Sequence, residues 1–196
     1  MQDWKAKQAA KASAAAAMQA AFPDLVPVGG SVDSLNAAAK NIRIELKRAF
    51  PKIKFSVKSE RFSMGDAIRV GWIDGPNSDQ VEEITGKYKA GSFNSMEDLY
   101  EYGKDAWNDA FGDAKFITCR REDSDKAIES AIRSVFAKYA MGDIAQPSVA
   151  EYKRGACWSV PIWNENLQSL IGQVLWKRVW CIAKAVPVAE MEAEAA

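Results

Sequence analysis

The sequence predicts an α+β fold in which a small antiparallel sheet of about three strands is covered by several helices. Three observations support this prediction. Two neighbouring segments alternate apolar and polar residues as half-buried strands do, and several stretches place apolar residues at the spacing of an amphipathic helix. Strands and helices also come in runs along the chain, which is the order typical of an α+β fold.

The chain begins with two predicted helices. Residues 2–21 favour a helix because alanine loses no side-chain entropy there, but the apolar face is weak, so we expect a loosely docked arm. The following FPDLVPVGGSVD breaks the helix and is the best candidate linker. From Ser34 to Phe50 apolar residues recur at helical spacing, with Asp33 or Ser34 as N-cap and Pro51 as terminator.

Strands are predicted in three places. The segments IKFSVKSE and AIRVGWID alternate and are rich in Val, Ile, Phe and Trp, as strands are. The intervening RFSMGD contains Gly65, which indicates an antiparallel hairpin. AKFITCRRE is the third strand candidate.

Further helices follow the strands. After the Asp-Gly-Pro turn, Asn77 or Ser78 caps one helix, and Asp123 or Ser124 caps a strongly amphipathic one. A last helix is predicted at about residues 165–184. The predicted organisation has three parts: an N-terminal helix and linker (1–33), an α-β-β-α-β domain (34–122), and a C-terminal helical part (123–196) packed on the same core.

Composition excludes several kinds of active site. Histidine is absent, which removes the usual partner of a nucleophilic Ser or Cys and the commonest metal ligand. The three cysteines are widely spaced and form no Cys-x-x-Cys, so they are typical of reduced, buried thiols. We therefore expect no enzyme, no cofactor and no metal.

Charge and hydropathy bear on the partners. Twenty-six basic and 26 acidic residues cancel, so electrostatic recognition must be local. The strongest apolar stretch, LQSLIGQVLWKRVWCIAKAV, is interrupted by Lys177 and Arg178 and is too polar to span a bilayer. We expect an intracellular protein without a membrane partner.

Two stretches carry a family resemblance, residues 40–76 and 86–121: KNIRIELKRAFPKIKFSVKSERFSMGDAIRVGWIDGP and GKYKAGSFNSMEDLYEYGKDAWNDAFGDAKFITCRR. Together they resemble the large polyvalent protein associated domain numbered twenty-nine in its series, over about residues 40–121. The specific part is the combination of IRIELKRAFP, KFSV, GWIDGP and YEY. Asn94 stands where we expect an acid in the Gly-x-Phe-Asp segment. The resemblance supplies no catalytic residues.

The resemblance implies a function connected with bacteriophages and conjugative elements, where such domains are thought to act against host defences or to help incoming DNA become established. We expect a non-enzymatic counter-defence protein, such as a stand-alone anti-CRISPR or an anti-restriction protein. It would bind a host CRISPR effector or restriction complex and block its access to DNA. The alternative is a nucleic-acid-binding accessory that protects or escorts incoming phage or plasmid DNA. Either would act in the cytoplasm of the host bacterial cell.

An acidic, aromatic segment is the candidate protein-binding surface. Between residues 97 and 113 only Lys104 opposes six acids, so the segment could dock on the basic nucleic-acid channel of a defence complex. Alternatively, the acids solvate a loop whose apolar residues enter the core. The candidate residues are Glu97, Asp98, Tyr100, Glu101, Tyr102, Asp105, Asp109 and Asp113.

A basic stripe is the candidate nucleic-acid surface. It begins along one flank of the helix after Ser34 and continues into the first strand, where it could track phosphates. The alternative is a solvated face. The candidate residues are Lys40, Arg43, Lys47, Lys52, Lys54, Lys58 and Arg61.

Two further groups have simpler interpretations. Asp66, Asp74 and Asp79 offer oxygen ligands for a divalent cation, but their spacing matches no EF-hand and suits a turn followed by a helix cap. Aromatic residues near the C-terminus belong either to the core or to a partner surface. They are Trp158, Trp163, Trp176 and Trp180.

Overall fold

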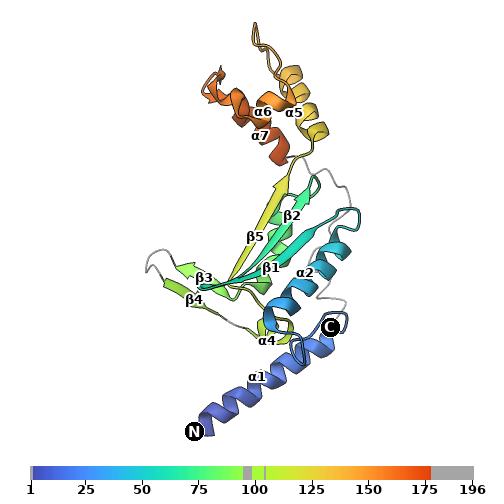
Figure 1. The fold of residues 1–196 in the computed structure, drawn as a ribbon, viewed down its shortest axis with the longest axis vertical. Coiled ribbons are helices and arrows are strands. Elements are labelled where there is room, and N and C mark those ends of the chain that lie inside the picture. Colours follow the sequence, from blue (N-terminus) through green and yellow to red (C-terminus); the bar gives the residue numbers. More distant parts are fainter. Residues whose placement is uncertain (1, 95–98, 104, 178–196) are drawn as a thin grey trace. The chain divides into compact units, whose positions relative to one another are not determined.

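The computed structural model describes residues 2–94, 99–103 and 105–177 (Figure 1). These residues form two compact units. Unit 1 comprises the described residues up to 72 and from 78 to 120, and unit 2 comprises residues 73–77 and 121–177. Helices and a small three-stranded sheet together confirm the predicted α+β fold class. Within the described residues, no helix combines the length and the apolar character needed to cross a membrane.

Unit 1 begins with helix α1 (Gln2–Ala21) and helix α2 (Ser34–Ala49). The C-terminal part of α1 docks on the core through Ala15 and Met18. Asp33 is the N-cap of α2, because its side chain accepts a hydrogen bond from the Asn36 N–H at 2.9 Å. The linker between the helices is fastened by Asn41, which is fully buried and hydrogen-bonds both Val26 and the Phe111 carbonyl.

The central sheet of unit 1 has the order β1 (Ser56–Phe62), β2 (Gly65–Ile73), β5 (Phe116–Glu122). β1 and β2 pair antiparallel, as predicted, with Val57 opposite Val70. The direction of β5 follows from hydrogen bonds near its two ends: the Lys115 N–H donates to Asp66, and the Asp74 N–H donates to the Glu122 carbonyl. β5 therefore runs parallel to β2, so the sheet is mixed and not wholly antiparallel as the sequence predicted.

The chain between β2 and β5 forms helices and a hairpin. Helix α3 (Ser78–Thr85) continues into the 3-10 helix η1 (Gly86–Tyr88). A second antiparallel pair, β3 (Gly91–Asn94) and β4 (Leu99–Tyr102), precedes helix α4 (Ala106–Phe111). The aromatic and acidic residues of this stretch follow no clear period, so the sequence did not predict the hairpin.

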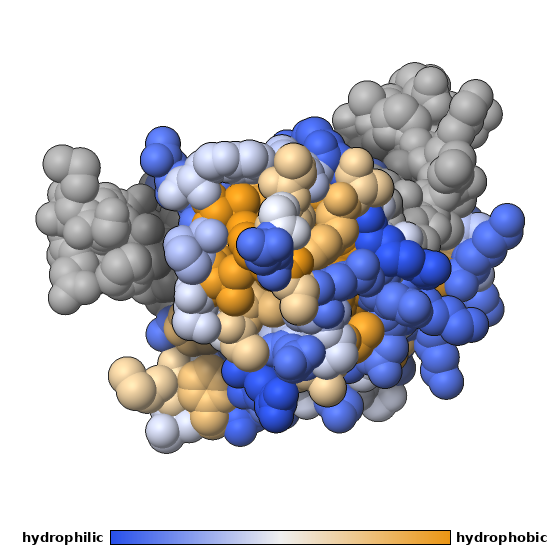
Figure 2. Space-filling view, turned by 90° about the horizontal axis from the view of Figure 1, so that it is seen from above, coloured by the Kyte–Doolittle hydropathy of each residue, from blue (hydrophilic) through white to orange (hydrophobic). Residues whose placement is uncertain are grey.

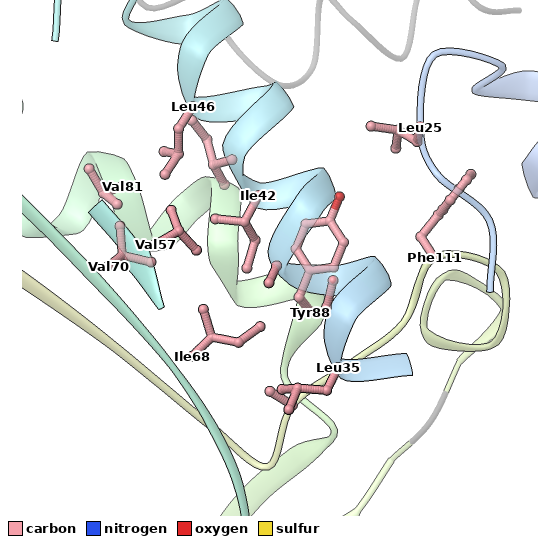
Figure 3. Close-up of a cluster of buried hydrophobic side chains, with 14 of the residues drawn as sticks. Leu25, Leu35, Ile42, Leu46, Val57, Ile68, Val70, Val81, Tyr88 and Phe111 are labelled. Atoms are coloured by element: carbon pink, nitrogen blue, oxygen red, sulfur yellow. The ribbon is translucent and has the colours of Figure 1, made fainter. Parts of the chain in front are cut away.

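The core of unit 1 lies between one face of the sheet and helices α2 and α3 (Figure 3). The inner face of the sheet contributes Val57, Ile68 and Val70, which are buried against α2. Most of the buried strand residues lie on this face, because alternate residues of each strand point the other way, although Ala67 is buried on the outward side. The sheet therefore has one open face. The labelled residues of this core are Leu25, Leu35, Ile42, Leu46, Val57, Ile68, Val70, Val81, Tyr88 and Phe111.

Unit 2 has a core of its own, although we expected the C-terminal part to pack on the core of the preceding domain. The reason is that α5 buries Ile128, Ile132 and Val135 against Leu167 and Ile171 of α7. The apolar stripes of these two helices thus cover each other. The elements of unit 2 are α5 (Asp125–Lys138), α6 (Val149–Lys153), the 3-10 helix η2 (Ala156–Ser159), β6 (Pro161–Ile162), β7 (Glu165–Asn166) and α7 (Leu167–Lys177).

Candidate nucleic-acid interface

The candidate site lies along the free edge of the sheet, where the end of α2 passes the start of β1. Arg43 of α2 reaches across and donates a guanidinium N–H to the carbonyl of Val57 in β1. A second N–H of the same guanidinium donates to the Ala39 carbonyl at 3.2 Å. β1 is an edge strand, and such strands leave backbone carbonyls without a strand partner. Arg43 therefore satisfies one of them and is held in place between helix and strand.

A cavity of about 370 Å³ opens beside Arg43, and we call it the basic cavity. Among the described residues that line it, four are cationic and none is acidic. Its aromatic side is anchored, because the Phe55 ring packs against Phe50 at 6.0 Å and against Trp72 at 5.6 Å between centroids. The lining residues are Arg43, Lys47, Pro51, Lys52, Ile53, Lys54 and Phe55.

The basic cavity combines charge with an open, aqueous position. Lys47, Lys52 and Lys54 are all exposed, so each keeps its hydration while its charge adds to the same local field. Four cations around one cavity repel one another, and a bound anion removes that repulsion. Lysine and arginine donate charge-assisted hydrogen bonds to phosphate oxygens. The lining side chains offer no hydroxyl, thiol or carboxylate, and their positive charges favour an anion in the cavity.

The structure brings together only part of the predicted basic stripe. Arg43, Lys47, Lys52 and Lys54 meet at the basic cavity because the chain turns back at Pro51. Lys40 is exposed nearly one helical turn before Arg43, and Lys58 is exposed on β1 beyond the cavity. Arg61 differs from the others, since it forms an ion pair with Asp33 at 2.8 Å.

Three acids of the predicted protein-binding segment have internal roles. Asp105 is the N-cap of α4, where its side chain accepts from the Asn108 N–H in a capping box. Asp109 forms an ion pair with Lys11 at 3.0 Å. Asp113 is 5% exposed and accepts a hydrogen bond from the Ser34 hydroxyl at 2.6 Å. These carboxylates thus hold elements of unit 1 together.

The other members of that segment divide into two groups. Tyr100, Glu101 and Tyr102 belong to β4, where they pair with Phe93, Ser92 and Gly91 of β3. Glu97 and Asp98 lie outside the described residues.

Two of the aspartates near the Asp-Gly-Pro turn, Asp66 and Asp74, accept hydrogen bonds from backbone N–H groups. Asp66 accepts from the Lys115 N–H at 2.7 Å, while Asp79 is exposed in the first turn of α3. Asp74 has a φ of +56° and accepts from the Ser124 N–H at 2.9 Å, next to the start of α5. Within the described part of the chain, no three His, Cys, Asp or Glu residues are grouped so that they could hold a metal ion. The side chain of Asp74 thus links the turn after β2 to the start of α5.

The C-terminal tryptophans are exposed on unit 2. Trp158, Trp163 and Trp176 are 62%, 70% and 50% exposed, and Trp180 lies outside the described residues. Trp158 and Trp176 line a second cavity of about 410 Å³. The view in Figure 2 shows hydrophobic residues gathered near the middle of the face that it draws. Among the described residues of unit 2, no tryptophan belongs to the α5–α7 core, so the core interpretation does not hold for Trp158, Trp163 and Trp176.

The open face of the central sheet was not among the predicted surfaces. The exposed outward residues of the three strands include Lys58, Phe62, Arg69, Phe116 and Arg120. The alternation of the strands could have predicted this face, because it places these residues on the side of the sheet away from the buried Val57, Ile68 and Val70. Only Lys58 of this set was among the predicted site residues.

Comparison with known proteins gives one match. A family model described as Large polyvalent protein associated domain 29 matches residues 33–134, just over half of the 196 residues. The matched stretch runs from the N-cap of α2 into α5 and includes the basic cavity and the open face. No curated protein and no solved structure matches the chain.

Proposed function

Because the chain belongs to the large polyvalent protein associated domain 29 family, it is a protein associated with phages and mobile elements, and we propose that it is a nucleic-acid-binding accessory. In this function it protects or escorts incoming phage or plasmid DNA by binding and has no catalytic activity. The observation that carries the proposal is the basic cavity, where Arg43, Lys47, Lys52 and Lys54 converge without an acidic neighbour in the lining.

A protein that binds the phosphate backbone of a nucleic acid requires a local cluster of positive charge. The chain as a whole carries no net charge, so the attraction for a polyanion comes from the cluster at the sheet edge. Each phosphate that a lysine or arginine neutralises releases condensed counterions, and this term is independent of base sequence. Lys40 on α2 and Lys58 on β1 are further exposed cations that could contact neighbouring phosphates.

The counter-defence function has less support from the described residues. It was expected to act through the acidic segment, yet Asp105, Asp109 and Asp113 are engaged in a cap, an ion pair and a buried hydrogen bond. Acids that already hold the fold are poorly placed to recognise a partner, because binding would have to break those contacts. We therefore favour the nucleic-acid function over the blocking of a defence complex.

Neutralising the basic cavity should weaken nucleic-acid binding and its salt dependence. We expect the triple variant Lys47→Gln, Lys52→Gln, Lys54→Gln to lower the slope of log K against log salt by about 2 for single strands and about 3 for duplex. The measurement is fluorescence anisotropy with labelled DNA at roughly 50 to 200 mM salt. The three lysines are exposed, so the fold should be retained.

The matched control changes the net charge equally on unit 2. It replaces Lys126, Arg133 and Lys138, which are exposed on α5, with glutamine. This control should bind as the wild type does. Absence of wild-type binding at the lowest salt, or an equal loss in the control, would rule out the proposed interface.

A further inference from the structure

The open face of the central sheet carries a stacked pair of aromatic rings. Phe62 of β1 and Phe116 of β5 lie 6.1 Å apart between ring centroids, with an interplanar angle of 24°. They come from the two strands that flank β2, yet their rings meet across it. This is possible because Gly65, which is opposite Phe62 in the register, presents no side chain between them.

The two rings remain accessible after folding. Phe62 is 44% exposed and Phe116 is 43% exposed, and Met64 in the adjacent turn is 77% exposed. The outward residues of β2 beside these rings, Gly65 and Ala67, are small, so no β2 side chain rises between the rings. The Lys115 side chain lies over Gly65, and its ammonium is 5.4 Å from the centre of the Phe116 ring. Exposed aromatic rings beside a cation are suited to a planar aromatic ligand that carries negative charge.

Cations are placed on the same face. Lys58 and Arg69 are directly opposite each other in the β1–β2 register. Two like charges in this arrangement destabilise the sheet unless an anion binds beside them. Glu60 relieves part of this repulsion through an ion pair with Arg69 at 2.5 Å. Arg120 adds a further exposed cation on β5. The face therefore favours a ligand that carries negative charge beside its aromatic parts.

We propose that the open face binds single-stranded nucleic acid, with bases stacked on Phe62 and Phe116 and phosphates held by Lys58, Arg69 and Arg120. The inference rests on the proposed function and deepens it by naming the form of nucleic acid. Unpaired bases can leave their own stack and lie on aromatic side chains, whereas the bases of a duplex are already stacked and paired. Lys58 belongs both to this face and to the predicted basic stripe.

The test distinguishes a requirement for aromatic rings from a requirement for apolar side chains of similar size. The double variant Phe62→Leu, Phe116→Leu keeps hydrophobic side chains of similar size, and the double variant Phe62→Tyr, Phe116→Tyr keeps the rings. The probes are a deoxythymidine strand of about 20 nucleotides and a duplex of equal length. We expect the leucine pair to lose about tenfold or more in affinity for the strand, with an unchanged salt slope and unchanged duplex affinity. The tyrosine pair should bind the strand as the wild type does.

Each of the other outcomes would contradict one part of the proposal. Equal affinity of the leucine pair and the wild type for the strand would remove the stacking surface. Equal losses on strand and duplex would show that the face does not select single strands. A change of oligomeric state in the leucine pair, measured by sedimentation, would assign the face to a second copy of the chain. In these cases binding through the basic cavity persists, whereas failure of the wild type to bind either probe rejects the proposed function itself.

Discussion

Replacing Gly112 with alanine should lower the free energy of unfolding of unit 1 by about 4 kcal/mol. Gly112 ends α4 with a φ of +89°, a conformation that side chains other than glycine rarely adopt. A Cβ at this position would lie 2.1 Å from the Ser34 carbonyl oxygen and 2.9 Å from the Ala38 nitrogen. Both atoms belong to the backbone of the first turns of α2, so the clash is relieved only by separating α4 from α2.

A substitution at a second glycine, Gly30, separates the backbone strain of a positive φ from the steric clash of the added Cβ. Gly30 has a φ of +60°, and a Cβ there would meet no heavy atom within 4 Å. The Gly30→Ala variant should therefore lose only about 1 kcal/mol, from backbone strain alone. Hydrogen exchange of the α2 and β2 amides measures unit 1 separately from unit 2. Equal effects of the two variants would show that the close approach of α4 to α2 does not limit stability.

Local signals in the sequence were sufficient for α2 and for the β1–β2 hairpin of unit 1, but not for the β3–β4 hairpin or α4. Asp33 was predicted as a candidate N-cap because it precedes a regular apolar repeat, and its side chain does accept from the Asn36 N–H. Two adjacent alternating segments predicted the β1–β2 hairpin, which the structure confirms. The strands extend further into the connection than expected, since Phe62 pairs with Gly65. Our prediction assigned residues 61–66 to the turn, so it ended the first strand too early and began the second too late.

Contacts between distant residues were not predictable from local patterns. Asp113 looked like a surface acid, and its burial depends on Ser34, which is 79 residues earlier in the chain. Asp105 was readable in principle, because an acid followed three residues later by Asn108 is a capping pattern. The basic stripe was visible along α2 from its spacing, but the basic cavity exists only because the chain reverses after Pro51. Spacing thus located the charges without showing which of them converge.

A buried polar network in unit 1 supports the second large stability prediction. Tyr88 is fully buried, and its hydroxyl donates to Glu45 Oε2 at 2.6 Å. The other carboxylate oxygen of Glu45 accepts from the Lys87 ammonium, also at 2.6 Å, and that ammonium lies 4.0 Å from the centre of the Trp107 ring. Tyr88→Phe removes a charge-assisted hydrogen bond from a carboxylate that is only 5% exposed. We expect a loss of about 2 kcal/mol in the free energy of unfolding near pH 7.

The same variant should also change the alkaline stability of unit 1. Burial, together with the negative charge of Glu45, raises the pKa of Tyr88 well above its ordinary value of 10.0. Below pH 10 the hydroxyl is protonated in both states, so its contribution to stability is complete. Above pH 10 only the unfolded chain releases this proton, and stability falls by up to about 1.4 kcal/mol per pH unit. Phenylalanine has no proton to release, so hydrogen exchange and urea titrations between about pH 8 and 11 should show a shallower decline in Tyr88→Phe. Parallel declines in the two proteins would mean that Tyr88 ionises as readily in the folded state as in the unfolded chain.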